Sequence, residues 1–194
     1  MTSSTTPTVL IVPGLRDHVE EHWQTLLQRA LPNARAVAPL EHDKLSRAAR
    51  VAALDAALRE IDGPVVLVAH SAGVMITVHW AQQHHRQIKG ALLATPVDLE
   101  TPLPEGYPTQ DALRENGWLP IPREPLPFPS IVVASTNDPL ARFERVAGMA
   151  QDWGSRLLHA GAVGHLNPAS GYGEWPRAVE LVAELSREPA HAPC

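Results

Sequence analysis

The stretch from Gly63 to Val74 constrains the fold of this chain more than any other. An apolar run over residues 65–69 leads directly into His70-Ser71-Ala72-Gly73, where an alanine-rich helical pattern begins. This order predicts a buried strand, a tight turn and a helix that leaves the turn. A strained strand-to-helix turn of this kind pushes a serine hydroxyl out of a sheet, as in a nucleophile elbow. Ser71 is therefore a candidate nucleophile, although a serine at this position could also serve only as a helix cap.

Short apolar segments and helical segments alternate along the rest of the chain. Strands are predicted over residues 8–12, 34–38, 65–69, 88–95, 130–134 and 156–160, and helices over 20–30, 46–60, 72–84, 109–116, 140–153 and 175–187. The alternation predicts an α/β fold with a six-stranded, mostly parallel sheet and helices on both faces. Residues 96–129 hold nine of the 19 prolines and are predicted to form an irregular excursion, too short for a full cap domain.

Length and composition limit the kinds of protein this chain can be. Its 194 residues suit one domain over the whole chain, with an ordered core over about residues 8–187 and loose ends. A formal net charge of -5 favours neither nucleic acid nor an anionic membrane as a partner. The first eight residues lack the features of a signal peptide, and no apolar run approaches the ~18 residues of a membrane span. We therefore expect a cytoplasmic protein. Its one cysteine, Cys194, cannot form an internal disulfide.

Three side chains with complementary chemistry follow strands of the predicted sheet. Ser71, Asp138 and His165 occur in the chain order typical of α/β-hydrolases. Imidazole can remove the proton of a serine during attack, and a carboxylate fixes the imidazole tautomer. The three are therefore predicted to form a catalytic triad, with Asp98 after the fourth strand as the alternative acid. On its own, Asp138 could form only a capping turn, and His165 could be an ordinary loop histidine.

Backbone N–H groups are expected to form the oxyanion hole of such a site. One belongs to Ala72, directly after the proposed nucleophile, and the other to the loop over residues 13–16. Leu15 is the first candidate in that loop and Gly14 the second. The elbow departs from Gly-x-Ser-x-Gly because Ala69 stands in place of the first glycine. We expect one additional methyl group to be tolerated there.

The segment His18-Val19-Glu20-Glu21-His22 matches a zinc motif, His-x-x-Glu-His. Two histidines four residues apart on a helix can share a metal ion. However, the segment opens a helix after the first strand, and no later helix is placed to supply a third ligand. Acidic residues in a first helical turn are also explained by the helix dipole. We therefore expect neither a metal nor another cofactor.

Several motifs occur together along the chain. They are Val12-Pro13-Gly14, His22-Trp23, Ala69-His70-Ser71-Ala72-Gly73, Asn137-Asp138-Pro139, Gly164-His165 and residues 170–176. Over about residues 9–185 they resemble the small serine hydrolases of the retinoblastoma-binding-protein-9 and YdeN-like group. The resemblance implies a minimal α/β-hydrolase with the triad named above and with esterase-like or amidase-like activity.

The sequence thus predicts a serine hydrolase that cleaves a small carboxylic ester, thioester or amide through an acyl-enzyme. Its expected partner is a small-molecule acyl substrate. Gly14, Trp23, Trp118 and Phe128 are candidates for contacting that substrate, although the three aromatic residues could equally cover the sheet. The alternative function is a protein-binding adaptor on a hydrolase scaffold, with little or no turnover, because a fold does not determine a function.

Overall fold

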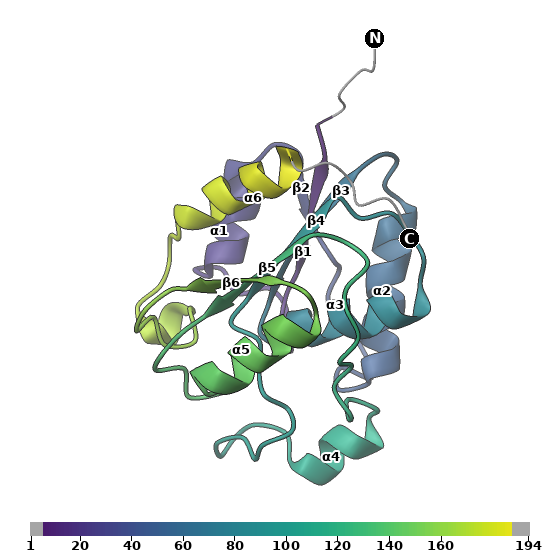
Figure 1. Ribbon diagram of the computed structural model, residues 1–194. Coiled ribbons are helices and arrows are strands. Elements are labelled where there is room, and N and C mark those ends of the chain that lie inside the picture. Colours follow the sequence, from purple (N-terminus) through teal and green to yellow (C-terminus); the bar gives the residue numbers. More distant parts are fainter. Residues whose placement is uncertain (1–5, 188–194) are drawn as a thin grey trace.

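The computed structural model describes residues 6–187, which are built around one six-stranded sheet (Figure 1). The strands are β1 (Thr8–Val12), β2 (Ala34–Ala36), β3 (Val65–His70), β4 (Gly90–Ala94), β5 (Ser130–Ala134) and β6 (Arg156–His159). Their order across the sheet is β2-β1-β3-β4-β5-β6, and every pairing is parallel. The predicted α/β sheet is confirmed. The ends predicted to be loose, with Cys194, lie largely outside the described residues.

Helices cover both faces of the sheet, as Figure 1 shows. They are α1 (Trp23–Ala30), α2 (Arg47–Arg59), α3 (Ala72–Gln83), α4 (Gln110–Glu115), α5 (Phe143–Asp152) and α6 (Arg177–Arg187). Apolar side chains of α1 and α6 pack on one face, and those of α2, α3 and α5 pack on the other. The central strands are therefore buried on both sides, which explains why their sequences are continuous apolar runs.

Some helix boundaries differ from the prediction. Helix α1 begins three residues late, at Trp23, because the ring of His22 caps it: the Nδ1 atom of His22 accepts the N–H of Gln24 at 3.2 Å. Helix α2 begins after Ser46 as predicted, with that hydroxyl accepting a hydrogen bond from the third residue of the helix at 3.2 Å. A 3-10 helix over Pro168–Ser170 was not predicted.

The proline-rich excursion, residues 96–129, contains α4 as its one α-helix, and the structure describes this whole stretch. Its buried apolar side chains belong to the same core cluster as α2, α3 and α5. They are Val97, Leu99, Leu113, Trp118, Ile121, Leu126 and Phe128. The excursion thus packs as part of the hydrophobic core rather than as a separate cap domain.

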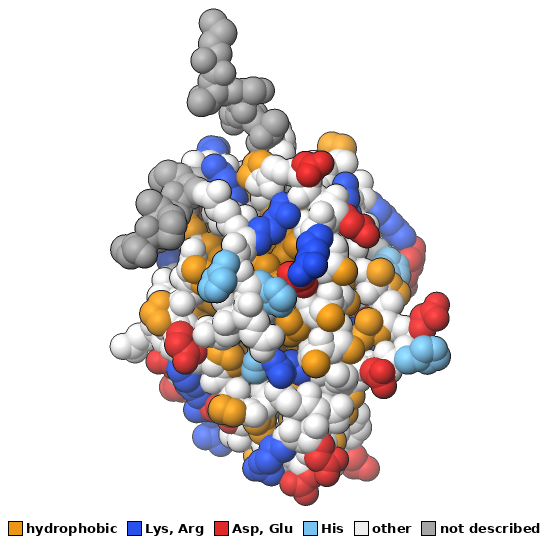
Figure 2. Space-filling view, turned by 90° about the vertical axis from the view of Figure 1, so that its right-hand side faces the viewer, with side chains coloured by type: hydrophobic (Ala, Val, Ile, Leu, Met, Phe, Trp, Pro, Cys, Tyr) orange, Lys and Arg blue, Asp and Glu red, His pale blue; other side chains and the backbone are white. Residues whose placement is uncertain are grey.

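The surface that carries α2 faces the viewer in Figure 2. Lysine and arginine side chains alternate there with acidic side chains, histidines and small hydrophobic side chains, so neither sign of charge dominates. Within residues 6–187, no helix combines the length and the apolar character that crossing a membrane requires.

Candidate active site

Ser71 lies at the turn between β3 and α3, in a backbone conformation that is rare for a residue with a side chain. Its φ is 57° and its ψ is -123°. The serine side chain makes no hydrogen bond to the helix it precedes, so it does not act as a helix cap. Ala69 is fully buried between β1 and β4, where the sheet accommodates its methyl group. The turn therefore holds a strained serine whose hydroxyl is free for another partner.

That partner is His165, which lies in the loop after β6. The Nε2 atom of His165 lies 2.8 Å from Ser71 Oγ, and its Nδ1 atom lies 2.8 Å and 3.0 Å from the two carboxylate oxygens of Asp138. The side chains of His165 and Asp138 are only 6% and 2% exposed. Asp138 also accepts the N–H of Leu140 at 2.9 Å, so it forms a turn as well as the contact to the imidazole. The three residues predicted to act together thus lie in one hydrogen-bonded row.

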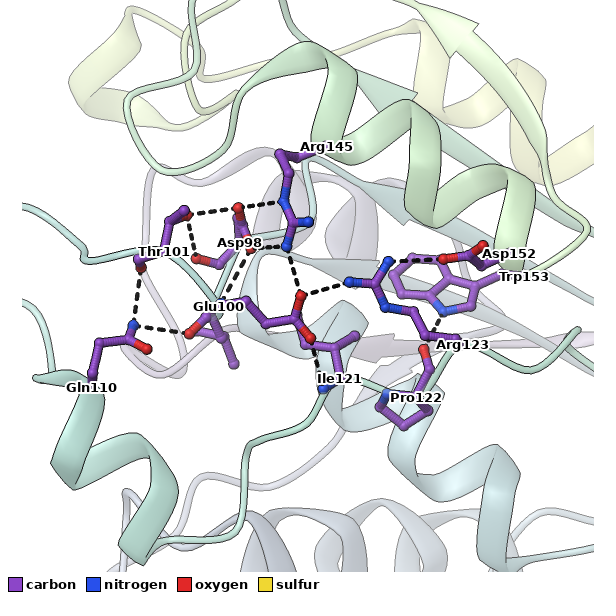
Figure 3. A network of polar contacts seen from close by, with 11 residues as sticks. Asp98, Glu100, Thr101, Gln110, Ile121, Pro122, Arg123, Arg145, Asp152 and Trp153 are labelled. Carbon is purple, nitrogen blue, oxygen red and sulfur yellow. Dashed lines mark hydrogen bonds and ion pairs between the residues drawn. The ribbon is translucent and has the colours of Figure 1, made fainter.

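The alternative acid, Asp98, belongs to a different network, drawn in Figure 3. Arg145 donates to both of its carboxylate oxygens, at 2.8 Å and 3.0 Å, and Thr101 donates a further hydrogen bond at 2.6 Å. Burial alone would raise the pKa of Asp98, but these hydrogen bonds outweigh it and lower that pKa. Asp98 is therefore fully occupied as a partner of Arg145 and makes no hydrogen bond to His165.

The main chain of His165 is held on both sides. Its N–H donates to Ser170 Oγ at 3.0 Å, and its carbonyl oxygen lies 2.8 Å from the Nε2 atom of His70. The hydroxyl of Thr95 donates to the same carbonyl at 3.3 Å. Sequence reasoning missed these supporting residues, although His70 directly precedes the proposed nucleophile and Thr95 directly follows β4.

The predicted oxyanion donors are main-chain N–H groups close to Ser71. Those of Ala72 and Leu15 donate to no other group in the described part of the chain. A methyl group built on Gly14 would lie 3.4 Å from the Cβ atom of Ser71, so the loop after β1 passes close to the proposed nucleophile. Both predicted oxyanion donors thus come from segments that adjoin the serine.

A cavity of about 790 Å³ lies beside the hydrogen-bonded row. Ser71, His165, Gly14 and Leu15 all contribute to its wall. Apolar side chains supply much of the remaining wall: Val97, Leu99, Leu103, Leu113 and Leu140. An acyl group could therefore bind there with its carbonyl near the serine.

The three aromatic residues predicted to contact substrate do not line this cavity. Trp23, the first residue of α1, is 1% exposed and packs edge-on against Trp175, with 4.9 Å between the ring centroids. Trp118 is fully buried, and its indole N–H donates to the carbonyl oxygen of Leu45 at 2.7 Å, as a buried tryptophan usually requires. Phe128 is 4% exposed in the core cluster of α2, α3 and α5. All three cover the sheet, which was the alternative interpretation, and we do not include them in the site.

The two histidines of the zinc-like motif have other partners. His22 caps α1 through Nδ1, and the Nε2 atom of His18 lies 3.3 Å from Glu20 on the surface. In residues 6–187, no group of three or more histidine, cysteine or acidic side chains is arranged to hold a metal ion. The zinc-like motif therefore lies at the start of α1, where His22 serves as the N-cap.

Sequence comparison decides the family. The profile of the family described as "Serine hydrolase" matches residues 9–184. The chain belongs to the serine hydrolase family. Its motif-based assignment to the YdeN-like group of α/β-hydrolases is thereby confirmed. No curated protein matches this serine hydrolase in sequence.

Solved structures extend the comparison. A YdeN-like hydrolase from Pectobacterium atrosepticum is 32% identical to this serine hydrolase, with a TM-score of 0.80 over 94% of this chain and 92% of that one. The ydeN gene product of B. subtilis is 18% identical, with a TM-score of 0.69 over 94% and 100%. The type II thioesterase BorB from the borrelidin biosynthetic cluster is 13% identical, with a TM-score of 0.65 over 94% of each chain. The last two share the fold with this serine hydrolase.

Proposed function

We propose that this serine hydrolase cleaves a small carboxylic ester, thioester or amide through an acyl-enzyme intermediate. The observation that carries the proposal is the row from Ser71 Oγ through the His165 ring to the Asp138 carboxylate, with a distance of 2.8 Å at each link. Nucleophilic catalysis by serine requires a base at hydrogen-bond distance from the serine, and a carboxylate that orients this base.

In the first half of the proposed reaction, Ser71 Oγ attacks the carbonyl carbon while its proton moves to Nε2 of His165. The carbonyl oxygen becomes an oxyanion, which the N–H groups of Leu15 and Ala72 stabilise. A donor of this kind typically contributes about 3 kcal/mol to transition-state stabilisation. The imidazolium, held by Asp138, then gives its proton to the leaving group as the bond to that group breaks.

In the second half, water replaces the serine as nucleophile. His165 takes a proton from the water, whose oxygen attacks the acyl carbon, and returns it to Ser71 Oγ as the acid product leaves. The apolar wall of the cavity suits the hydrocarbon part of an acyl group. A thioester is kept within the proposed substrate class because BorB, a structural neighbour, is named as a thioesterase.

The adaptor alternative explains less of the geometry. A purely binding scaffold has no need for a strained serine, and a residue held at this φ costs on the order of 1–3 kcal/mol. Retaining that strain next to an aligned base supports a catalytic role.

A fluorophosphonate probe tests the proposal because it reacts covalently with activated serines. We expect it to label the wild-type protein and not the Ser71→Ala variant. Ser155→Ala is the matched control, since the Ser155 hydroxyl pairs with that of Ser130 and does not line the cavity, and its labelling should equal that of the wild type. No labelling of folded wild-type protein would contradict the proposal and favour the adaptor.

A further inference from the structure

His22 lies in the wall of the cavity, and the proposed triad does not use it. Its ring contacts the ring of His70, with 4.5 Å between centroids, and the ring of His70 lies 4.9 Å from that of His165. Three imidazoles therefore follow one another from the proposed base outward. His22 is the one at the end of this row, and it shares the cavity with Ser71.

The position of the proton on His22 follows from its helix cap. Its Nδ1 atom accepts the N–H of Gln24 at 3.2 Å, so Nδ1 carries no proton and Nε2 must carry it. The pKa of His22 is lowered to about 4, mainly by burial and to a smaller extent by electrostatic repulsion from His165. The ring is thus neutral near pH 7, with one fixed N–H donor.

This N–H has no partner in residues 6–187, yet solvent can reach it. Within those residues, the side-chain nitrogen and oxygen atoms that are both buried and unpaired are Trp23 Nε1 and Arg47 Nε, and His22 Nε2 is not among them. Since only 8% of His22 is exposed and the residue lines the cavity, the accessible donor faces the cavity. A substrate that excludes water from this donor must replace the lost hydrogen bond or bind less well.

We propose that His22 determines specificity by donating a hydrogen bond from Nε2 to an ether, hydroxyl or carbonyl oxygen of the substrate near the scissile bond. The inference rests on the proposed hydrolase function. Much of the remaining wall is apolar, so the matching substrate is an otherwise apolar ester with one such oxygen. The oxygen can belong to the acyl group or to the leaving group.

Two pairs of esters separate these two sources. p-Nitrophenyl methoxyacetate differs from p-nitrophenyl butyrate by an oxygen in place of a methylene in the acyl group. 2-Methoxyethyl butyrate differs from butyl butyrate by the same exchange in the leaving group. For each pair, the oxygen-to-methylene ratio is the kcat/KM of the oxygen-containing ester divided by that of its methylene counterpart. Comparing this ratio between wild type and variant cancels the difference in intrinsic reactivity between the two esters.

Two substitutions divide the two roles of His22. His22→Asn keeps a side-chain acceptor for the N–H of Gln24, since asparagine is a preferred N-cap, but it removes the donor at Nε2. His22→Gln places an amide N–H near the former Nε2 position and weakens the cap. We expect His22→Asn to lower the oxygen-to-methylene ratio about 5- to 10-fold in one pair, with an unfolding temperature near that of the wild type. His22→Gln should retain most of the ratio and lose stability.

An unchanged ratio in both pairs for folded His22→Asn overturns the inference, as does an equal loss in His22→Gln. Should His22→Asn not fold, His22→Ser repeats the test with another good N-cap. His85→Asn, an exposed histidine outside the cavity, is the control and should leave both ratios unchanged. If the wild type hydrolyses no ester and does not react with the fluorophosphonate, the proposed function itself fails. If the wild type hydrolyses the esters but the oxygen-to-methylene ratios do not change in the His22 variants, only the present inference fails.

Discussion

The imidazole of His70 contacts the main chain of His165: the Nε2 atom of His70 lies 2.8 Å from the carbonyl oxygen of His165. His70 is the last residue of β3 and is 5% exposed. Burial lowers its pKa well below 6.5, and the electrostatic repulsion that it would meet from protonated His165 or His22 acts in the same direction. The ring therefore stays neutral and donates its Nε2–H to the carbonyl. The sheet thus holds the loop that carries the proposed base.

We predict that His70 is a positioning residue for the proposed reaction. His70→Phe removes the donor and should lower kcat for p-nitrophenyl butyrate about tenfold, with a smaller change in KM, because the base is then less well placed. His70→Gln can donate from a similar position and should restore most of kcat. Steady-state kinetics with thermal unfolding as a check on folding would measure this. Equal kcat values for the two variants would contradict a role of the hydrogen bond.

The two candidate acids should behave differently on substitution. Asp138→Asn removes the charge next to Nδ1 of His165 and permits the wrong tautomer, so kcat should fall about 10⁴-fold, as in other serine hydrolases with this arrangement. Asp98→Asn should leave kcat within a few fold, because its carboxylate pairs with Arg145. Burst-phase kinetics with a p-nitrophenyl ester would compare them. A larger loss in Asp98→Asn would reverse the assignment of the acid.

Much of the fold was predictable because its strands are long apolar runs. β1 and β5 have the predicted ends, and β3 extends only one residue further, since strands buried on both faces contain few polar residues. Helix starts were less predictable. Helix α5 begins at Phe143 rather than at Leu140. The carbonyl oxygen of Leu140 instead accepts the N–H of Asp98 at 3.0 Å. Because these two residues are 42 positions apart, the local sequence gives no sign of this contact.

The proposed triad was predictable for a different reason. Its residues follow strands, and parallel strands bring their carboxyl ends to one edge of the sheet. The cavity wall was not predictable in the same way. Trp118 and Leu113 are both apolar residues of the excursion, yet only Leu113 reaches the cavity. Apolar residues of a core and of a pocket look alike in a sequence, so side-chain direction decides between them.

The network in Figure 3 should stabilise the excursion against α5. Arg145 bridges Asp98 and Glu100, and Asp98 is only 1% exposed. Arg145→Met leaves that buried carboxylate with fewer donors and should lower the free energy of unfolding by about 2–3 kcal/mol. Arg114→Met removes an exposed pair with Asp111 and should cost less than about 0.5 kcal/mol. Urea unfolding of both variants measures the difference, and similar losses would argue against a stabilising network.

Three buried histidines should make stability fall in mild acid. Burial lowers the pKa of His22 and of His79 to about 4, and that of His70 well below 6.5. In the unfolded chain all three titrate near 6.5, so below that pH the unfolded state binds more protons than the folded state. The free energy of unfolding should therefore decrease as the pH falls from 6.5 to 5, by up to about 1.4 kcal/mol per pH unit for each histidine.

Urea unfolding at pH 7.5, 6.5 and 5.5 checks this dependence above the range in which carboxylates titrate. His79→Gln keeps a donor for the carbonyl of Trp118, which lies 3.2 Å from His79 Nε2, but cannot be protonated. Its stability should therefore depend less steeply on pH, by the contribution of one histidine. A wild-type free energy that stays constant between pH 6.5 and 5.5 would contradict the burial of these rings as neutral groups.

Gly73 marks where α3 passes closest to the end of β1. A Cβ atom at this position would lie 2.1 Å from the carbonyl oxygen of Val12 and 2.8 Å from that of Pro13, so the helix and the strand would have to separate. Gly73→Ala should therefore lower the free energy of unfolding by about 3 kcal/mol or more. It should also displace the loop that carries the Leu15 N–H and reduce ester hydrolysis.

Gly148→Ala, within α5, is the control: a Cβ atom there meets no atom within 4 Å, and the variant should stabilise the protein by up to about 1 kcal/mol. Denaturant midpoints for the two variants should consequently move in opposite directions, and a shift of equal sign would show that close packing at Gly73 does not limit the fold.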